Sequence, residues 1–321
     1  MVSKTINNCA KLEETKKMTF NETKSNYQIV EFGDKKSREE INERVKRGPI
    51  KKTDKYKYLG EIVNNKGTHK DSIENKEKKI HGLAKAITKN AEHTGERYGK
   101  VVEKLYLTTA RPYLTFNMET WSAISRSEMA SVEKMQKDVL FKVYETPKST
   151  PYEPFLSEIG IWPMRHYINY KRLLLLYNLI NSPTEDRVAT KILKVQMDND
   201  TPNCWYSELK EQCEQYEIDM TKVKEITKNA WKKIIRKAIT KTFESEEWVN
   251  RTKSRFCKNS SRKKYVDETD KNTMKEIMRV RLNMVNMKMN FRNQHKQQDA
   301  RNAWFVIRQM IRRNIYLSAK R

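Results

Sequence analysis

Hydrophobic residues recur along most of the chain at three- and four-residue steps, which is the spacing of one face of an α-helix. This pattern predicts helices over Ile73–Ala91, Lys100–Ala110, Met129–Val143 and Arg165–Ile180. The second is expected to end at Arg111-Pro112, because proline interrupts helical hydrogen bonding. The fourth is apolar on nearly every side at Leu173–Leu176, so we expect it to be central and buried.

Three further helical patterns lie in the last third of the chain. The first has an apolar stripe, and its lysines and arginines lie largely around that stripe. The stripe consists of Val223, Ile226, Ala230, Ile234, Ala238 and Thr242. The other two patterns are Met274–Met289 and Ala300–Leu317. In Ala300–Leu317 an apolar seam of Trp304, Ile307, Ile311 and Ile315 contrasts with Arg301, Arg308, Arg312 and Arg313.

Strand patterns occur only near the N-terminus. Tyr27–Val30 reads as a short strand, and Tyr56–Val63 as an alternating strand that ends at the turn residues Asn64–Gly67. Four prolines between Pro147 and Pro163 predict an irregular connector. Gly and Pro each occur only 8 times in 321 residues, which argues against many-stranded folds. We therefore expect a mainly α fold with a small N-terminal β-hairpin.

Charge divides the chain into parts. Residues 1–184 carry 34 basic and 23 acidic side chains, residues 185–221 carry 4 and 9, and residues 222–321 carry 28 and 9. Most of the net charge of +25 therefore lies in the last third. We predict an N-terminal β region (1–68), a helical domain (69–184), an acidic linker (185–221) and a basic helical region (222–321).

So basic a surface favours a polyanionic partner, because each lysine or arginine that meets a phosphate releases a counterion. The alternative is an ordinary solvated helical surface. We expect contacts with the backbone of RNA or DNA, and Trp231 or Trp248 could stack on bases. The expected phosphate contacts are Lys232, Lys233, Arg236, Lys237, Arg262, Lys263, Lys264, Arg308 and Arg312.

Catalytic and metal motifs are not found. The four cysteines and five histidines lack zinc-finger spacing, Gly95–Lys100 is one residue short of a Walker A loop, and no Asp-Asp pair occurs. No metal or other cofactor is expected for the chain. The longest apolar run is Leu173–Tyr177 and Met1–Lys17 is polar, so we expect an intracellular protein of the nucleus or cytoplasm, not a secreted or membrane protein.

Several strings resemble the reverse transcriptases of non-LTR (LINE-type) retrotransposons. Leu105–Leu114 followed by Glu119-Thr120-Trp121 is similar to the family's L-Y-x-T-x-x-x-P-x-L-x-Y-G-x-E-T-W segment. Tyr56-Lys57-Tyr58-Leu59-Gly60 resembles its Y-K-Y-L-G hairpin, and Asn21–Ser25 its N-x-x-K-T element. The resemblance covers roughly residues 18–293. It implies the end of the polymerase palm, the thumb and the linker that follows.

The resemblance also implies residue roles. Lys24 corresponds to the lysine that donates a proton to pyrophosphate, and Tyr56, Tyr58, Leu59 and Gly60 to the element that grips the primer. The family's aspartate motifs precede the lysine element and are not found here, so Mg²⁺ is expected only with a complete palm. The family's Tyr-Gly before Glu-Thr-Trp is replaced by Phe116-Asn117.

We therefore expect a fragment or remnant of such an enzyme that binds nucleic acid without sequence specificity and does not polymerise alone. One alternative is a part of an active reverse transcriptase whose palm lies outside this chain or on another chain. Another is an inert helical protein without a partner. The oligomeric state stays open.

Overall fold

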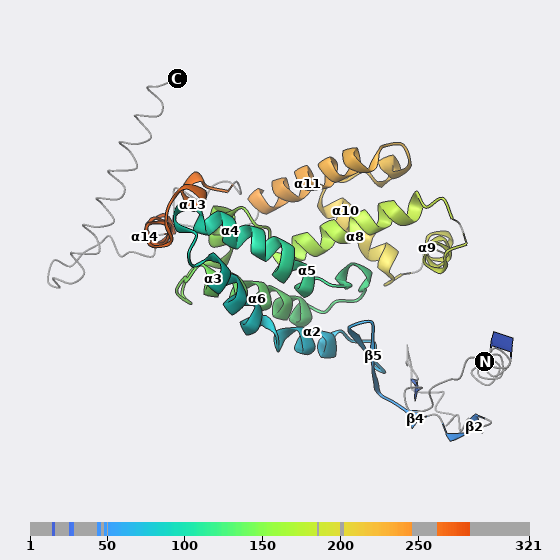
Figure 1. Cartoon of the computed structure of the whole chain (residues 1–321). Helices are drawn as coiled ribbons and strands as arrows, with labels where there is room; N and C mark the ends of the chain where they lie inside the picture. Colours follow the sequence, from blue (N-terminus) through green and yellow to red (C-terminus); the bar gives the residue numbers. More distant parts are fainter. Residues whose placement is uncertain are drawn as a thin grey trace. The chain divides into compact units, whose positions relative to one another are not determined.

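The structure, a computed structural model, describes residues 15–16, 26–28, 44–45, 48–49, 51–184, 186–199, 202–245 and 262–282. The described part is mainly α-helical with a small N-terminal β-hairpin, which confirms the predicted fold class (Figure 1). The chain divides into two compact units, residues 1–75 and 76–321.

The first unit contains the β-hairpin. Strands β5 (Lys55–Tyr58) and β6 (Glu61–Asn64) pair antiparallel, and Tyr58 lies opposite Glu61. Leu59 and Gly60 form the two-residue turn, with φ values of 46° and 93°. Positive φ at both positions is the requirement of a type I′ turn, which glycine satisfies readily. Tyr56–Val63 is therefore two strands, and the expectation of one continuous strand is wrong.

Four two-residue strands accompany the hairpin. Strand β1 (Asn26–Tyr27) pairs in parallel with β4 (Lys51–Lys52), and β2 (Arg44–Val45) pairs antiparallel with β3 (Gly48–Pro49). Tyr27 of the predicted Tyr27–Val30 strand thus lies in a strand. Ile29 and Val30 lie outside the described residues.

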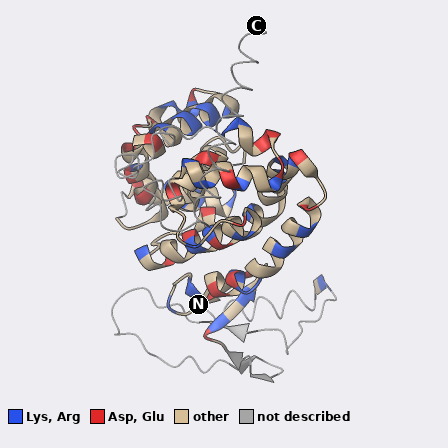
Figure 2. Ribbon diagram, turned by 90° about the vertical axis from the view of Figure 1, so that its left-hand side faces the viewer, with Lys and Arg blue, Asp and Glu red and all other residues tan. Residues whose placement is uncertain are grey.

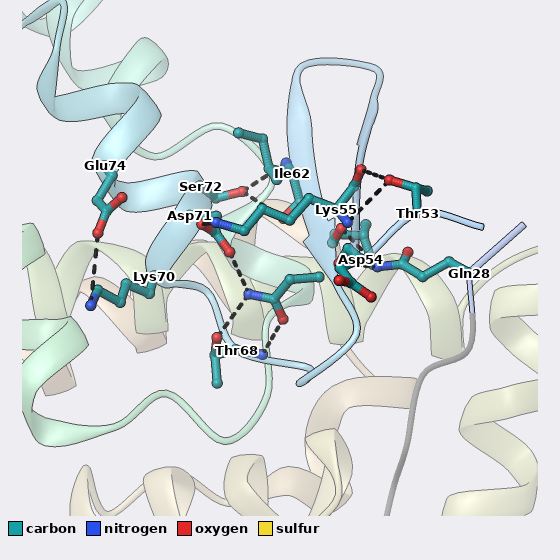
Figure 3. A network of polar contacts seen from close by, with 12 residues as sticks. Gln28, Thr53, Asp54, Lys55, Ile62, Thr68, Lys70, Asp71, Ser72 and Glu74 are labelled. Atoms are coloured by element: carbon teal, nitrogen blue, oxygen red, sulfur yellow. Dashed lines mark hydrogen bonds and ion pairs between the residues drawn. The ribbon is translucent and has the colours of Figure 1, made fainter. Parts of the chain in front are cut away.

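Polar side chains join the hairpin to the start of helix α2 (Lys70–Glu77) (Figure 3). Asp71 forms an ion pair with Lys55 and accepts a hydrogen bond from Asn64 Nδ2 at 2.7 Å. The backbone N–H of Ile62 donates to Ser72 Oγ at 2.9 Å. The donors Lys55 and Asn64 hold the pKa of the Asp71 carboxyl below its ordinary value. The hairpin is therefore anchored mainly through one carboxylate and one hydroxyl.

The first half of the second unit packs apolar helix faces together. It contains α3 (Ile80–Ala91), a 3-10 turn (Gly95–Arg97), α4 (Tyr98–Leu105), α5 (Arg111–Leu114), a 3-10 turn (Met118–Thr120) and α6 (Arg126–Val143). Ile80, Ala84 and Ile87 form the buried face of α3, at the predicted spacing. Helix α6 begins with a capping box in which Ser125 and Glu128 satisfy each other's backbone N–H groups.

The helical path continues through Arg111-Pro112, where the sequence pattern predicts an end. Residues Tyr106–Ala110 form a π-helical turn between α4 and α5, and the backbone N–H of Arg111 bonds to the carbonyl of Tyr106. Pro112 lies in the first turn of α5, a position where the missing N–H of proline is tolerated. The wider π turn thus accommodates a proline that would interrupt a regular α-helix.

The proline-rich connector also contains a helix, which corrects the expectation of an irregular segment. Helix α7 (Tyr152–Ile159) starts after Pro151, and Pro154 lies in its first turn, where proline is tolerated. Gly160 ends the helix in the left-handed conformation, with φ 67°. Phe155 and Leu156 are fully buried. The prolines therefore position a short helix whose apolar side chains enter the core.

Helix α8 (Met164–Ile180) is central to a second apolar cluster, and this confirms its predicted burial: Leu173 and Leu176 are fully buried. Around it lie α9 (Val188–Asp198), α10 (Trp205–Gln215), a 3-10 helix (Met220–Lys224) and α11 (Lys228–Ser245). Residues 185–221 thus differ from the predicted acidic linker. Their apolar residues are widely spaced among charges, yet they contribute Leu193, Leu209, Cys213, Tyr216 and Ile218 to the cluster.

The last described segment lies close to two glycines far away in sequence. It contains α13 (Lys264–Glu268) and α14 (Lys271–Arg281), and the latter is the described part of the predicted Met274–Met289 helix. A Cβ atom added to Gly99 would lie 1.9 Å from the carbonyl oxygen of Val266. One added to Gly160 would lie 2.6 Å from Cβ of Arg262. The segment therefore occupies space that exists because both residues lack side chains.

Among the helices of the described segments, none combines the length and the apolar character that crossing a membrane requires.

The two glycines Gly99 and Gly82 give a matched test of this packing. Gly99→Ala should lower the free energy of unfolding by about 1–3 kcal/mol, because the backbone of Val266 must move away. Gly82 lies in α3 with no atom within 4 Å of an added Cβ. Gly82→Ala should therefore raise stability by about 0.5–1 kcal/mol, the helical advantage of alanine. Urea unfolding of both variants measures the two signs; a Gly99→Ala variant as stable as the parent contradicts the packing.

Candidate nucleic-acid interface

Helix α11 carries six basic residues and one acidic residue, and its rotation about its own axis decides which of them face solvent. Trp231, Ile235, Ile239 and Phe243 form the buried face of the helix. The predicted stripe through Ala230, Ile234 and Ala238 is therefore wrong, and Ile234 is 37% exposed. The observed stripe contains two aromatic rings. Aromatic side chains bury more apolar area than alanine, so the helix turns their side inward.

Trp231 is consequently unable to stack on a base, contrary to the sequence-based expectation. Its side chain is fully buried, and its indole Nε1 donates a hydrogen bond to the backbone carbonyl of Leu173 at 3.0 Å. Trp248, the other tryptophan considered for stacking, lies outside the described residues. Of the residues of α11 predicted to contact nucleic acid, the charged ones therefore remain.

Lys233, Lys237 and Lys241 recur at four-residue steps on the side of α11 opposite the buried stripe, and all three are exposed. We call them the lysine stripe. Four residues of α-helix rise about 6 Å, so the three Cα atoms span about 12 Å. For Lys233 and Lys237, the described part of the chain offers no acidic partner. Lys241 forms an ion pair with Glu217.

Two further basic residues of α11 border the lysine stripe. Arg236 is exposed and its guanidinium lies over the ring of Tyr170, 5.6 Å from the centroid, while Lys232 is half-buried. A groove of about 620 Å³ runs beside the C-terminal half of the helix. Its described lining comes from α11: Arg236, Lys237, Thr240, Lys241, Glu244 and Ser245. The structure thus brings four of the predicted contacts, Lys232, Lys233, Arg236 and Lys237, together on one helix.

Arg262 is an internal anchor and not a surface contact for phosphate, which corrects its predicted role. Its Nε and Nη2 atoms donate to Asp267 Oδ1 at 2.9 and 2.7 Å, and Glu103 lies 3.4 Å away. Its remaining donors bond to the backbone carbonyls of Ile159 at 2.9 Å and Gly99 at 3.0 Å. A guanidinium with all these partners has little capacity left for a ligand.

The remaining predicted contacts have different positions. The backbone N–H of Lys263 bonds to the carbonyl of Glu158 at 3.1 Å. Lys263 therefore belongs, like Arg262, to the last described segment and contacts α7 through its backbone. Lys264 is exposed at the start of α13. Arg308, Arg312 and the proposed proton donor Lys24 lie outside the described residues.

The hairpin exposes the residues that resemble a primer-gripping element. Tyr56 and Tyr58 lie on one face of β5, and Leu59 is at the turn; all three are exposed. The pairing of Tyr56 with Val63 adds an exposed valine to the same face. Sequence reasoning missed Val63 because its position follows from the register that the two-residue turn sets. Lys57 of the same strand is also exposed.

The segment around Glu119-Thr120-Trp121 joins three parts of the second unit. Glu119 forms an ion pair with Lys171 at 2.6 Å, and its backbone carbonyl accepts a hydrogen bond from the indole of Trp205 at 2.8 Å. Asn117, which lies where the motif that this segment resembles has glycine, adopts φ 61°. Asparagine tolerates this left-handed conformation better than most residues, so the substitution keeps a backbone geometry that glycine also permits.

Within the described segments, the Cys213 thiol and the carboxylates were considered as possible reactive or metal-binding groups. Burial raises the pKa of the Cys213 thiol to about 12, which keeps it protonated and a poor nucleophile. Across these segments, no three His, Cys, Asp or Glu side chains lie close enough together to hold a metal ion.

Basic and acidic residues are mixed over most of the described helices (Figure 2).

Comparisons with known proteins add no identity: no family model, no curated protein and no solved structure matches the chain.

Arg262 and Lys264 allow the anchoring role to be separated from a surface role. Arg262→Met should lower the free energy of unfolding by about 2–3 kcal/mol, because charge-assisted hydrogen bonds are lost and carboxylates are left without their partner. Lys264→Ala, two residues away and exposed, should change it by less than about 0.5 kcal/mol. Chemical denaturation of both variants measures the difference. Equal stabilities would show that Arg262 does not anchor the segment.

Proposed function

We propose that this chain binds RNA or DNA through the phosphate backbone, without sequence specificity, as part of a protein related to non-LTR retrotransposon reverse transcriptases. The observation that carries the proposal is the lysine stripe of α11. Lys233 and Lys237 are exposed, lie on the side opposite the buried stripe and have no acidic partner within the described part of the chain.

The geometry of the stripe supports contact with phosphates and not with bases. Lysine ammonium groups are point charges on flexible stems, so they suit successive phosphates of a strand. Specific readout needs side chains that form paired hydrogen bonds with base edges, usually from an element inserted into a groove. The aromatic residue on α11 that could have added stacking, Trp231, is fully buried. Affinity should therefore depend steeply on salt and little on sequence.

The hairpin supports the family part of the proposal. Its Tyr-Leu-Gly residues form the turn region, and both tyrosines are exposed. Exposure is what contact with the end of a primer strand would require. Asn117 in the left-handed conformation keeps the backbone geometry that the family's glycine permits. The carboxylates that would hold the Mg²⁺ ions of a polymerase are not present as a cluster in the described segments. The proposal therefore assigns binding, and not polymerisation, to this chain.

Removing two lysines tests the site directly. For Lys233→Ala/Lys237→Ala, the slope of log K against log salt should become shallower by about 1.4–1.8, since each phosphate contact contributes about 0.7 for single strands and 0.9 for duplexes. Fluorescence anisotropy with labelled RNA and DNA oligonucleotides of mixed sequence, measured over a salt series, gives the slope. The parent protein should bind several sequences of equal length with similar affinity.

The matched control is Lys85→Ala/Lys89→Ala on α3. These two lysines are also exposed, also four residues apart, and their removal changes the net charge by the same amount. The control should keep the parent slope. Equal slope changes in both double variants would mean that general charge, and not the lysine stripe, attracts the nucleic acid. No binding by the parent at 50 mM salt would overturn the proposed function.

A further inference from the structure

Two tyrosines of helix α8 each lie beneath an arginine of a neighbouring helix. The guanidinium of Arg111, the first residue of α5, lies over the ring of Tyr167, 4.0 Å from its centroid. The guanidinium of Arg236 in α11 lies over the ring of Tyr170, and the two tyrosine rings stack with their centroids 6.1 Å apart. We call these four residues the arginine–tyrosine ladder. It connects α11, α8 and α5, which are neighbours in the second unit (Figure 1).

Arginines with a structural role in this protein pair with carboxylates. Such ion pairs, with N–O distances of 2.5–3.3 Å, are formed by Arg165, Arg172, Arg262 and Arg281. Within the described part of the chain, neither Arg111 nor Arg236 has an ion pair of this kind. The charge of Arg111 acts on Glu103 from a distance, but the Glu103 carboxylate pairs with Arg262. The ladder arginines therefore keep donors that no described carboxylate uses.

Stacking on a ring orients an arginine without occupying its N–H groups. A guanidinium contacts a ring with its face, whereas the donors lie at its edge, where they can bind two oxygens of one phosphate. The buried Nε of Arg111 has no hydrogen-bond partner among the described residues, although most buried polar atoms in proteins have one. Contact with Tyr167, and not a carboxylate or carbonyl, therefore orients this side chain. Arg111 is half-buried and Arg236 is exposed, so both side chains are accessible to a ligand from solvent.

The tyrosine rings of the ladder are largely covered by their neighbours. Each ring contacts an arginine and the other tyrosine, and Tyr170 also packs against Trp162, with the ring centroids 5.9 Å apart. Tyr170 is only 8% exposed. Base stacking needs an accessible aromatic face. Of the two parts of a nucleic acid, the phosphate therefore fits the ladder better than the base.

We propose that Arg111 and Arg236, held in place by Tyr167 and Tyr170, bind phosphates of the nucleic-acid backbone and continue the lysine stripe from α11 across α8 to α5. The inference rests on the proposed function and extends its site. Arg236 directly precedes Lys237 of the stripe, so the two sites adjoin. Composition did not select Arg111, because it is the only charged residue of Leu105–Leu114.

The dimensions of the ladder suit a single strand of nucleic acid. The three distances along it limit the separation of the two guanidinium carbons to about 16 Å. Along one strand of a duplex, which rises about 3.4 Å per nucleotide, this separation corresponds to no more than about five nucleotides. Arg111 and the lysine stripe can therefore contact phosphates of the same strand.

Single substitutions in the full-length chain test the ladder. Arg111→Met removes one phosphate contact, so the slope of log K against log salt should become shallower by about 0.7–0.9. Tyr167→Leu keeps that charge but releases the arginine, whose immobilisation then opposes binding, so affinity should fall about two- to tenfold with the slope unchanged. Tyr167→Phe keeps the ring and should bind like the parent. Fluorescence anisotropy with labelled RNA and DNA oligonucleotides of mixed sequence, over a salt series, measures both affinity and slope.

The matched control is Arg97→Met. Arg97 is exposed and precedes Arg111 on the same helical path, about 20 Å away at the rise of an α-helix. Its removal changes the net charge equally and should keep the parent slope. Arg111→Lys covers the case in which Arg111→Met does not fold. It keeps the charge but not the planar fork, so affinity should fall about two- to tenfold with the slope unchanged.

The results separate this inference from the proposed function. A parent slope in Arg111→Met, an equal slope change in Arg97→Met, or parent affinity in both Tyr167→Leu and Arg111→Lys would overturn the role of the ladder. The effect of Lys233→Ala/Lys237→Ala, and with it the proposed function, would still stand. No binding by the parent would overturn the proposed function and this inference together.

Discussion

The hydrogen bond between the Trp231 indole and the backbone carbonyl of Leu173 fixes how α11 lies on α8. Helix α8 is the buried centre of the second cluster, and its backbone carbonyl at Leu173 accepts the hydrogen bond of the one polar atom that a fully buried tryptophan must satisfy. Residues adjacent in a helix point about 100° apart, so this bond also determines the outward residues. Because Trp231 faces the core, the lysine stripe on the opposite side of α11 faces solvent.

The basic residues of this molecule have two structural roles, which the net charge does not distinguish. The guanidinium of Arg262 donates to the carbonyls of Gly99 in α4 and Ile159 in α7, and that of Arg281 pairs with Glu158 of α7, so both hold the last described segment against these helices. Lys233 and Lys237 point to solvent with no acidic partner among the described residues. Arginine suits the first use because its planar fork binds a carboxylate with two hydrogen bonds, whereas lysine remains a mobile point charge. The basic region is thus part anchor and part surface.

Helix periodicity predicted most of the second unit, because α3, α6 and α8 each have an apolar stripe of regular spacing. The periodicity gave wrong predictions where another part of the chain determines the local structure. Pro112 is tolerated because a π turn precedes it, and α9 and α10 pack although their apolar residues are widely spaced among polar and charged ones. At the candidate site the lysines of α11 were predictable from composition. The burial of Trp231 and Arg262 was not, since both depend on carbonyls and carboxylates distant in sequence.

The close fit of residues 262–268 against Gly99 and Gly160 has a consequence for the order of folding. Arg262 bonds to the carbonyl of Gly99, 163 residues earlier in the chain. During synthesis α4 and α7 leave the ribosome long before this segment exists, and contacts of such separation form late because the intervening loop must close first. Until then Glu158, fully buried in the native protein, has yet to receive Arg281 and Tyr265. In the nascent protein the Glu158 carboxylate therefore stays without these two partners until the C-terminal third of the chain has been made.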